Sequence, residues 1–147
     1  MKSRAYRVLQ VLMLLVCVAH IVIGAGLNLA SDGMVASMAS SYGAESAEWS
    51  AQLLYIVKPL GAFMLVLGLL AAAAAANPTR YRAVVYAFSV LFLIRAVQRI
   101  AFSTEIHDIF GIAVSRNTGN AIFFAVLAVV LVVCDRLAAR PALSEPA

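Results

Sequence analysis

The segment that decides the fold is VLFLIRAVQRIAF, residues 90–102. With the residues before it, this segment is long and apolar enough to cross a lipid bilayer, since a spanning helix needs about 20 mostly apolar residues. Its second half nevertheless carries Arg95, Gln98 and Arg99. Charged side chains within a membrane helix are costly, and by default they face the protein interior and mark a functional site. The rest of the chain should therefore supply partners for the two arginines, either acids of the protein or an anionic ligand.

The composition is that of a membrane protein. Of 147 residues, 64% are hydrophobic and 12% are charged, whereas a soluble domain carries about 25% charged residues. We expect a single all-α domain over residues 1–147, a four-helix transmembrane bundle that ends in a disordered tail at 141–147. The four apolar stretches that predict its spanning helices lie at about residues 8–30, 50–76, 81–102 and 118–137. No basic run with interleaved aromatic residues occurs, which argues against nucleic-acid binding.

Charge is distributed unevenly between the two ends of the predicted helices. The amino-terminal arm, the turn at 77–82 and the carboxyl-terminal tail hold seven basic residues, and the two longer connections, 31–49 and 103–117, hold five of the seven acids. The positive-inside rule therefore predicts that both termini are cytoplasmic. Apolar residues at helical spacing within both longer connections predict short helices lying in the membrane interface. The alanine- and arginine-rich composition favours a bacterial inner membrane.

The second predicted span has the residues of a tightly packed helix. It contains Pro59, Gly61, Gly68 and six alanines at Ala71–Ala76. Because small residues let helix backbones approach closely, we expect this span to be the central helix of the bundle. The short turn after it predicts that the second and third spans are neighbours.

Neighbouring second and third spans would bring two polar stripes together. Glu48 and Tyr55 fall on one stripe of the second span, with Lys58 to one side, and Arg95 and Arg99 share one face of the third span because residues four apart are adjacent on a helix. The expected result is a polar pocket that opens outward, rimmed by acids and floored by three cations.

Two interpretations of this pocket remain open. In the structural one, Glu48, Glu105 or Asp108 neutralise the arginines, and the protein is a small accessory or interaction protein whose polar cluster holds the fold. In the functional one, the surplus cations bind an amphipathic anion or lipid headgroup, since arginine suits carboxylate and phosphate. The candidate ligand-binding residues are Lys58, Arg95, Arg99, Gln98, Tyr55 and His20. Expected partners are the lipid bilayer, an anionic lipid or organic anion, and a membrane protein or second copy of the chain.

Other chemistries receive little support from the sequence. His20, near the middle of the first span, is expected to be a neutral histidine hydrogen-bonded to another helix. Glu105, His107 and Asp108 have metal-ligating side chains, but their spacing turns the histidine away from the acids, so no metal site is predicted. Cys17 and Cys134 do not form a C-x-x-C pair, and we expect both to be buried thiols. No catalytic triad or glycine-rich nucleotide loop appears, so an enzyme is the least favoured class and no cofactor is predicted.

A family resemblance rests on two short motifs. They are Lys58-Pro59-x-Gly61-Ala62, with Gly68 one heptad later, and Ile94-Arg95-x-x-x-Arg99 in the third span. In these motifs and in its four short spans, the chain resembles the small bacterial DoxX-like membrane proteins, a broad group that includes BphX-like families. The resemblance implies a four-helix membrane fold, and, by analogy with some members, a redox-associated membrane subunit as a third function.

Overall fold

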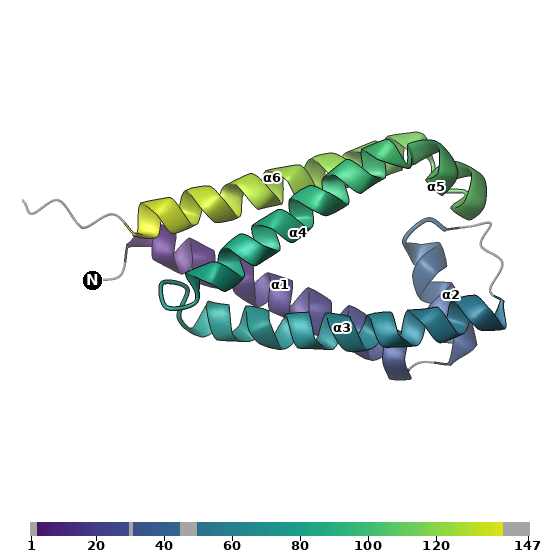
Figure 1. Ribbon diagram of the computed structural model, residues 1–147, viewed down its shortest axis with the longest axis horizontal. Coiled ribbons are helices and arrows are strands. Elements are labelled where there is room, and N and C mark those ends of the chain that lie inside the picture. The colour runs from purple at the N-terminus through teal and green to yellow at the C-terminus, as the bar shows by residue number, and fades with distance from the viewer. Residues whose placement is uncertain (1–2, 30, 45–49, 140–147) are drawn as a thin grey trace, which may run out of the picture.

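The computed structural model describes residues 3–29, 31–44 and 50–139, and within these ranges the chain is helical without strands. Four of its helices are long and apolar enough to cross a membrane, as expected for a multi-pass membrane protein. The described elements (Figure 1) are α1 (Arg4–Leu29), α2 (Asp32–Ser41), α3 (Ala51–Ala76), α4 (Arg82–Ala101), α5 (Ser103–Phe110) and α6 (Val114–Ala138).

The predicted helices occur close to their expected places. The long helices coincide with the four predicted spans, and α2 and α5 confirm that each longer connection contains a short helix. Two of the long helices begin four residues earlier than predicted: α1 at Arg4 rather than at residue 8, and α6 at Val114 rather than at residue 118. Asn117, predicted to lie in a connection, is therefore inside a spanning helix. The tail at 141–147, predicted to be disordered, and Glu48 lie outside the residues that the structure describes.

The long helices form two pairs that are joined at one end. α3 packs along α1, α4 packs along α6, and α1 also contacts α6. Figure 1 shows that the pairs converge where α1 begins and α6 ends, and spread apart toward α2 and α5. We call these the closed end and the open end. The hydrophobic core lies toward the closed end, where Leu9, Met13, Val85, Phe88 and Leu131 are almost fully buried.

Small residues bring α1 and α3 into backbone contact. A Cβ atom placed on Gly61 would lie 2.9 Å from the carbonyl oxygen of Gly24, and one placed on Gly24 would lie 2.8 Å from the carbonyl oxygen of Gly61. Close helix approach at small residues was expected, but the expectation that α3 is the central helix was wrong. The most apolar window of α3 is 17% buried against 28% for α1, because α3 contacts mainly α1 whereas α1 also contacts α6.

The predicted pairing of the second and third spans was also wrong. Asn77–Tyr81 does form a tight turn, with Arg80 and Tyr81 amides donating to the Asn77 carbonyl. Beyond this turn, however, α3 follows α1 and α4 follows α6, so the two helices diverge (Figure 1) and have few contacts. The polar stripes of α3 and α4 consequently do not meet.

An ion pair joins α4 to α6 at the closed end. Arg82 donates from Nε to Oδ1 of Asp135 at 3.0 Å and from Nη2 to Oδ2 at 2.7 Å. The Asp135 side chain is 1% exposed, and two-pronged arginine–carboxylate contacts are among the stronger polar interactions. This is the single ion pair within residues 3–29, 31–44 and 50–139. Asp135, which lies in the long helix α6, is thus already paired with Arg82. It is far along the chain from Arg95 and Arg99.

Candidate functional site

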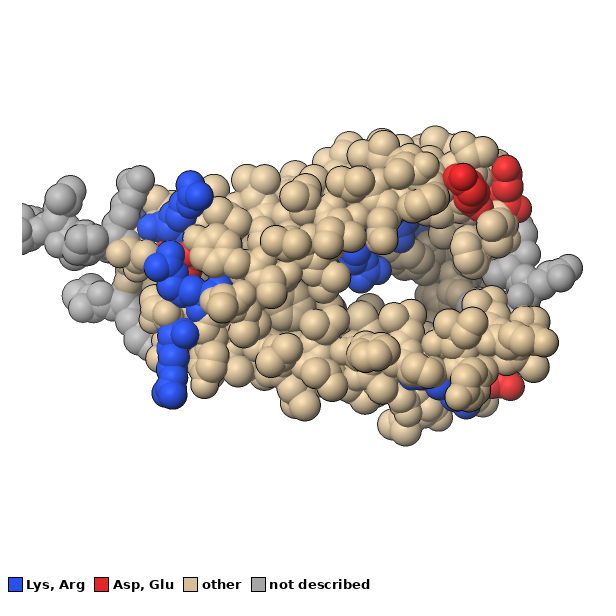
Figure 2. Space-filling view, viewed as in Figure 1, with Lys and Arg blue, Asp and Glu red and all other residues tan. Residues whose placement is uncertain are grey.

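A cavity of about 430 Å³ lies between the two helix pairs. Figure 2 shows the hollow, with Lys or Arg side chains (blue) in its wall and residues of other types (tan) around them. A volume in this range is typical of pockets that hold small organic molecules. The cavity is lined by Leu12, Leu15, Val16, Ala19, His20, Ile23, Tyr42, Met64, Phe92, Arg95, Phe123, Phe124 and Leu127. Its wall is therefore almost entirely apolar, with three polar side chains.

Arg95 is the charged group of this cavity. Its guanidinium carbon lies 4.8 Å from the ring centre of Phe124 on α6, a cation–π distance. Within the described ranges, no acid pairs with Arg95 and no hydrogen bond satisfies its guanidinium. A half-buried guanidinium beside an apolar cavity is an unusual arrangement, because intramembrane charges are normally paired. Arg95 is therefore the group of this site best placed to receive an anion.

Arg99, one turn further along α4, is bound by the protein itself. Its Nη1 donates to Oδ1 of Asn117 at 2.7 Å, and Nδ2 of Asn117 donates back to the carbonyl oxygen of Arg99 at 2.6 Å. Its Nη2 donates to the hydroxyl of Tyr42. The Arg99 guanidinium carbon also lies 5.1 Å from the Tyr42 ring centre. Arg95 and Arg99 thus have different surroundings, although they share one face of α4.

These contacts connect the open ends of the helices. Asn117 is 1% exposed and also donates to Oγ of Ser103 at 3.3 Å, so it joins α6 to α4 and to the start of α5. Arg116 donates from Nη2 to the Ser41 carbonyl at 2.9 Å. Arg99 and Arg116 therefore hold the carboxyl end of α2 against the α4–α6 pair, across the open end of the hollow.

Tyr42 stands between two cavities. It lines the cavity of Arg95 and also a smaller one of about 260 Å³ that contains Arg99. The other residues of the smaller cavity are Ala39, Ala44, Ile106, Phe110 and Ile112. Tyr42 thus contributes to the walls of both cavities, and its hydroxyl accepts a hydrogen bond from Arg99.

His20 lines the larger cavity from α1, with 4% of its surface exposed. Its Nδ1 lies 2.8 Å from the Val16 carbonyl oxygen, and since a carbonyl only accepts, Nδ1 carries the proton. This bond lies within α1 and not across to another helix as expected. Its ring packs on Phe88, with centres 5.3 Å apart, and its Nε2 has no hydrogen-bond partner in the described part of the chain.

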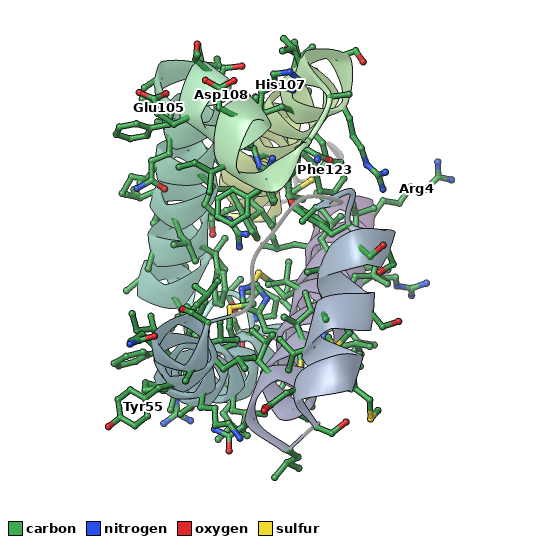
Figure 3. All side chains as sticks on the ribbon, turned by 90° about the vertical axis from the view of Figure 1, so that its right-hand side faces the viewer. Arg4, Tyr55, Glu105, His107, Asp108 and Phe123 are labelled. Atoms are coloured by element: carbon green, nitrogen blue, oxygen red, sulfur yellow. The ribbon has the colours of Figure 1, made fainter. Side chains whose placement is uncertain are left out.

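Three of the predicted site residues lie apart from the cavities. Lys58, Tyr55 and Gln98 are exposed on the bundle surface and line neither cavity. Figure 3, viewed from the open end, shows Tyr55 at the edge of the bundle. The expected floor of three cations is thus not formed, because α3 turns Lys58 away from α4. Arg95 and His20 share the larger cavity, and Arg99 lines the smaller one.

Two of the three predicted acidic partners, Glu105 and Asp108, lie within the described residues, and neither pairs with an arginine there. Glu105 and Asp108 are exposed on α5 (Figure 3), and within the described ranges neither is in an ion pair. His107 of the same helix bonds to the Ile112 carbonyl at 3.2 Å. Over the residues that the structure describes, no three metal-ligating side chains gather at one place. Cys17 and Cys134 are free thiols packed beside the hydrophobic core.

Asn117, Tyr42 and Phe124 belong to the site but were not predicted from the sequence. A signal for two of them exists in α6, where the inward positions recur at spacings of three and four: Asn117, Ala121, Phe124, Ala128, Leu131 and Asp135. Because the fourth span was predicted to begin at residue 118, Asn117 was not included in this stripe. Nothing in the sequence signals that Tyr42, more than 50 residues from Arg99, reaches the guanidinium.

Comparisons with protein-family models, with curated proteins and with solved structures found no match to this chain. The resemblance to DoxX-like proteins therefore stays a prediction that rests on the two short motifs alone.

Proposed function

We propose that this multi-pass membrane protein binds an amphipathic anion in the cavity of Arg95. One observation carries this proposal: a guanidinium that has no acidic partner among the described residues lies in the wall of a cavity whose other lining residues, apart from His20 and Tyr42, are apolar. A ligand with a carboxylate or phosphate and an apolar body matches both parts. Arginine binds either anion through paired N–H donors, and hydrogen bonds to charged groups are worth about 1.5–3 kcal/mol each.

Our proposed setting is a bacterial inner membrane with both termini in the cytoplasm. The open end, with α2 and α5, then faces outward, and the two short helices lie in the outer interface. The charge asymmetry supports this orientation, because seven basic residues lie at the closed end or in the flanking termini and basic residues favour the cytoplasmic side. In this orientation Arg95 sits in the outer half of the membrane.

Orientation can be tested by labelling single cysteines in cells with a membrane-impermeant maleimide, in a background that lacks Cys17 and Cys134. We expect Ser40→Cys, in α2, to react from outside, and Thr79→Cys, in the turn before α4, to react only after the membrane is opened. The reverse pattern would contradict the proposed orientation.

The binding function is tested by native mass spectrometry of the purified protein. The wild-type chain should carry an added mass that collisional activation releases as an anion, and Arg95→Gln should carry little of it. Lys58→Gln is the matched control, because Lys58 is a membrane-helix cation outside both cavities, and this variant should retain the ligand. Equal occupancy in wild type and Arg95→Gln, or none in wild type after incubation with anionic lipid, would refute the proposal.

A second function is supported by the surroundings of Arg99. Because Asn117 and Tyr42 occupy its guanidinium, this half of the polar cluster serves the fold, as an accessory or interaction protein would require. If that role is the whole function, Arg95→Gln and wild type will purify with the same partner proteins and neither will carry an anion. A redox-associated role has less support, since Cys17 and Cys134 are both free.

A further inference from the structure

The larger cavity is elongated along α1. Its wall includes Leu12 and Ile23, which are eleven residues apart on one helix and so about 16 Å apart at 1.5 Å per residue. The cavity is therefore a channel that follows the bundle axis. Its length is more than half of the roughly 30 Å hydrocarbon thickness of a bilayer.

The charge of this channel is confined to the part toward the open end. The His20 ring contacts Phe88 and Phe92 on α4, so these residues mark the same level of the bundle. Arg95 is three to seven residues further along α4, which places its backbone about 5–10 Å closer to the open end. On the other side of His20, toward the closed end, α1 contributes Leu12, Leu15 and Val16 to the wall. One end is thus cationic and the other is apolar.

The dimensions of the channel correspond to one hydrocarbon chain. Carbon–carbon bonds of about 1.52 Å at tetrahedral angles advance roughly 1.25 Å per carbon, so a 16 Å channel accepts about 13 carbons in extended form. If a methylene group takes the roughly 30 Å³ of a liquid water molecule, the volume of about 430 Å³ holds about 14. The length and the volume of the cavity both correspond to one alkyl chain, whereas two alkyl chains of this length would need about twice the volume.

We infer that the occupant of this channel is a single-tailed amphipathic anion, with its carboxylate or phosphate on Arg95 and its one alkyl chain directed toward Leu12. The inference rests on the proposed binding function and narrows it to a ligand class. Arg99, the second arginine, lines the neighbouring cavity, and its guanidinium already donates to Asn117 and Tyr42. A compact head with one charged group therefore fits the site better than a head that requires two arginines.

The test compares lipids that share a headgroup and differ in tail number. The full chain in nanodiscs of zwitterionic phosphatidylcholine is titrated with myristoyl lysophosphatidate, dimyristoyl phosphatidate, myristate and hexanoate, and binding is followed by native mass spectrometry. We expect lysophosphatidate to bind at least tenfold more tightly than phosphatidate, and myristate at least tenfold more tightly than hexanoate. The difference between lysophosphatidate and myristate distinguishes a phosphate-bearing lipid from a fatty acid as the preferred source of the anion.

Two variants make the outcomes distinguishable. Arg95→Gln should weaken every long-chain probe at least tenfold. Ala19→Phe adds a phenyl ring to the α1 wall of the channel, between Leu12 and Ile23, and should weaken myristate but not hexanoate. Phosphatidate bound as tightly as lysophosphatidate, with loss in Arg95→Gln, would overturn the single-tail inference and leave the proposed function standing. Anion binding unaffected by Arg95→Gln would overturn both. Myristate binding unchanged in Ala19→Phe would overturn the placement of the tail.

Discussion

Replacing Asn117 by alanine tests whether the two arginines of α4 have separate roles. The side chain of Asn117 makes three hydrogen bonds while 1% exposed: it accepts from Arg99 Nη1 at 2.7 Å, and donates to the Arg99 carbonyl at 2.6 Å and to Ser103 Oγ at 3.3 Å. Alanine removes all three and leaves a buried gap where α4, α5 and α6 meet. We therefore expect Asn117→Ala to lower the stability of the folded bundle.

The size of the loss follows from the environment of these bonds. In water-soluble proteins a hydrogen bond contributes about 0.5–1.5 kcal/mol and one to a charged group about 1.5–3 kcal/mol. Side-chain bonds between membrane helices contribute less, about 0.6 kcal/mol on average. Three bonds at the membrane value give a loss of about 2 kcal/mol. Because about 1.4 kcal/mol corresponds to a factor of ten, the unfolding constant should rise about 30-fold.

The measurement is equilibrium unfolding by sodium dodecyl sulfate in mixed micelles, with Asn120→Ala as the matched control. Asn120 lies one turn further along α6, and within the described part of the chain its side chain makes no hydrogen bond. The control should stay within about 0.5 kcal/mol of wild type, as most substitutions away from packed or hydrogen-bonded positions do. Equal losses in the two variants, or no loss in Asn117→Ala, would refute the conclusion that Arg99 is held by α6.

Three further predictions concern the packing of the bundle. Gly61→Ala should lower the free energy of unfolding by about 1–3 kcal/mol in the same assay, as overpacking usually does, because its methyl group would lie 2.9 Å from a backbone oxygen of α1. Gly119→Ala, the control, has open space around it and should be neutral or slightly stabilising. Equal effects of the two substitutions would contradict the close crossing of α1 and α3. His20→Phe should leave the free energy of unfolding within about 1 kcal/mol of wild type and should retain alkyl-chain binding. The reason is that it removes Nε2, a buried nitrogen without a hydrogen-bond partner among the described residues, and such a group costs about 1–3 kcal/mol. A loss of binding would show that the ligand donates a hydrogen bond to Nε2. Arg82→Gln should lower the melting temperature, and adding Asp135→Asn should restore part of it, because the single variant leaves the buried Asp135 carboxylate, 1% exposed, without its arginine; additive losses would show that the two side chains are not coupled.

The composition of the chain and the helical spacing of its apolar residues were sufficient to predict its helices. Four long apolar stretches have few alternatives in a membrane, because a backbone without water must satisfy its own hydrogen bonds, and all four spanning helices are found near their predicted limits. The short helices α2 and α5 were predicted in the same way, from apolar residues at helical spacing. The error at α6 arose because Asn117 is polar, and a polar residue next to a connection resembles part of that connection.

The sequence analysis could not predict how the helices pair. Helices that are apolar on every side show no single face that must be buried, so burial alone does not select neighbours in a membrane. The short turn between α3 and α4 favoured contact between these two helices. In the structure, however, the glycine contact joins α1 to α3, and the ion pair of Arg82 with Asp135 joins α4 to α6. Lys58 is consequently exposed, and the predicted cluster of three cations does not form.

By itself, the sequence determined that this chain forms four helices long and apolar enough to span a membrane, and that Arg95 and Arg99 share one face of the third. Only the tertiary structure decided that these arginines differ. α6 places Asn117 beside Arg99 and Phe124 near both arginines. The Arg99 guanidinium is therefore hydrogen-bonded within the protein, whereas the Arg95 guanidinium faces an apolar cavity. The physical reason is that a residue's own helix sets only its direction, whereas its partners come from helices far away in the sequence.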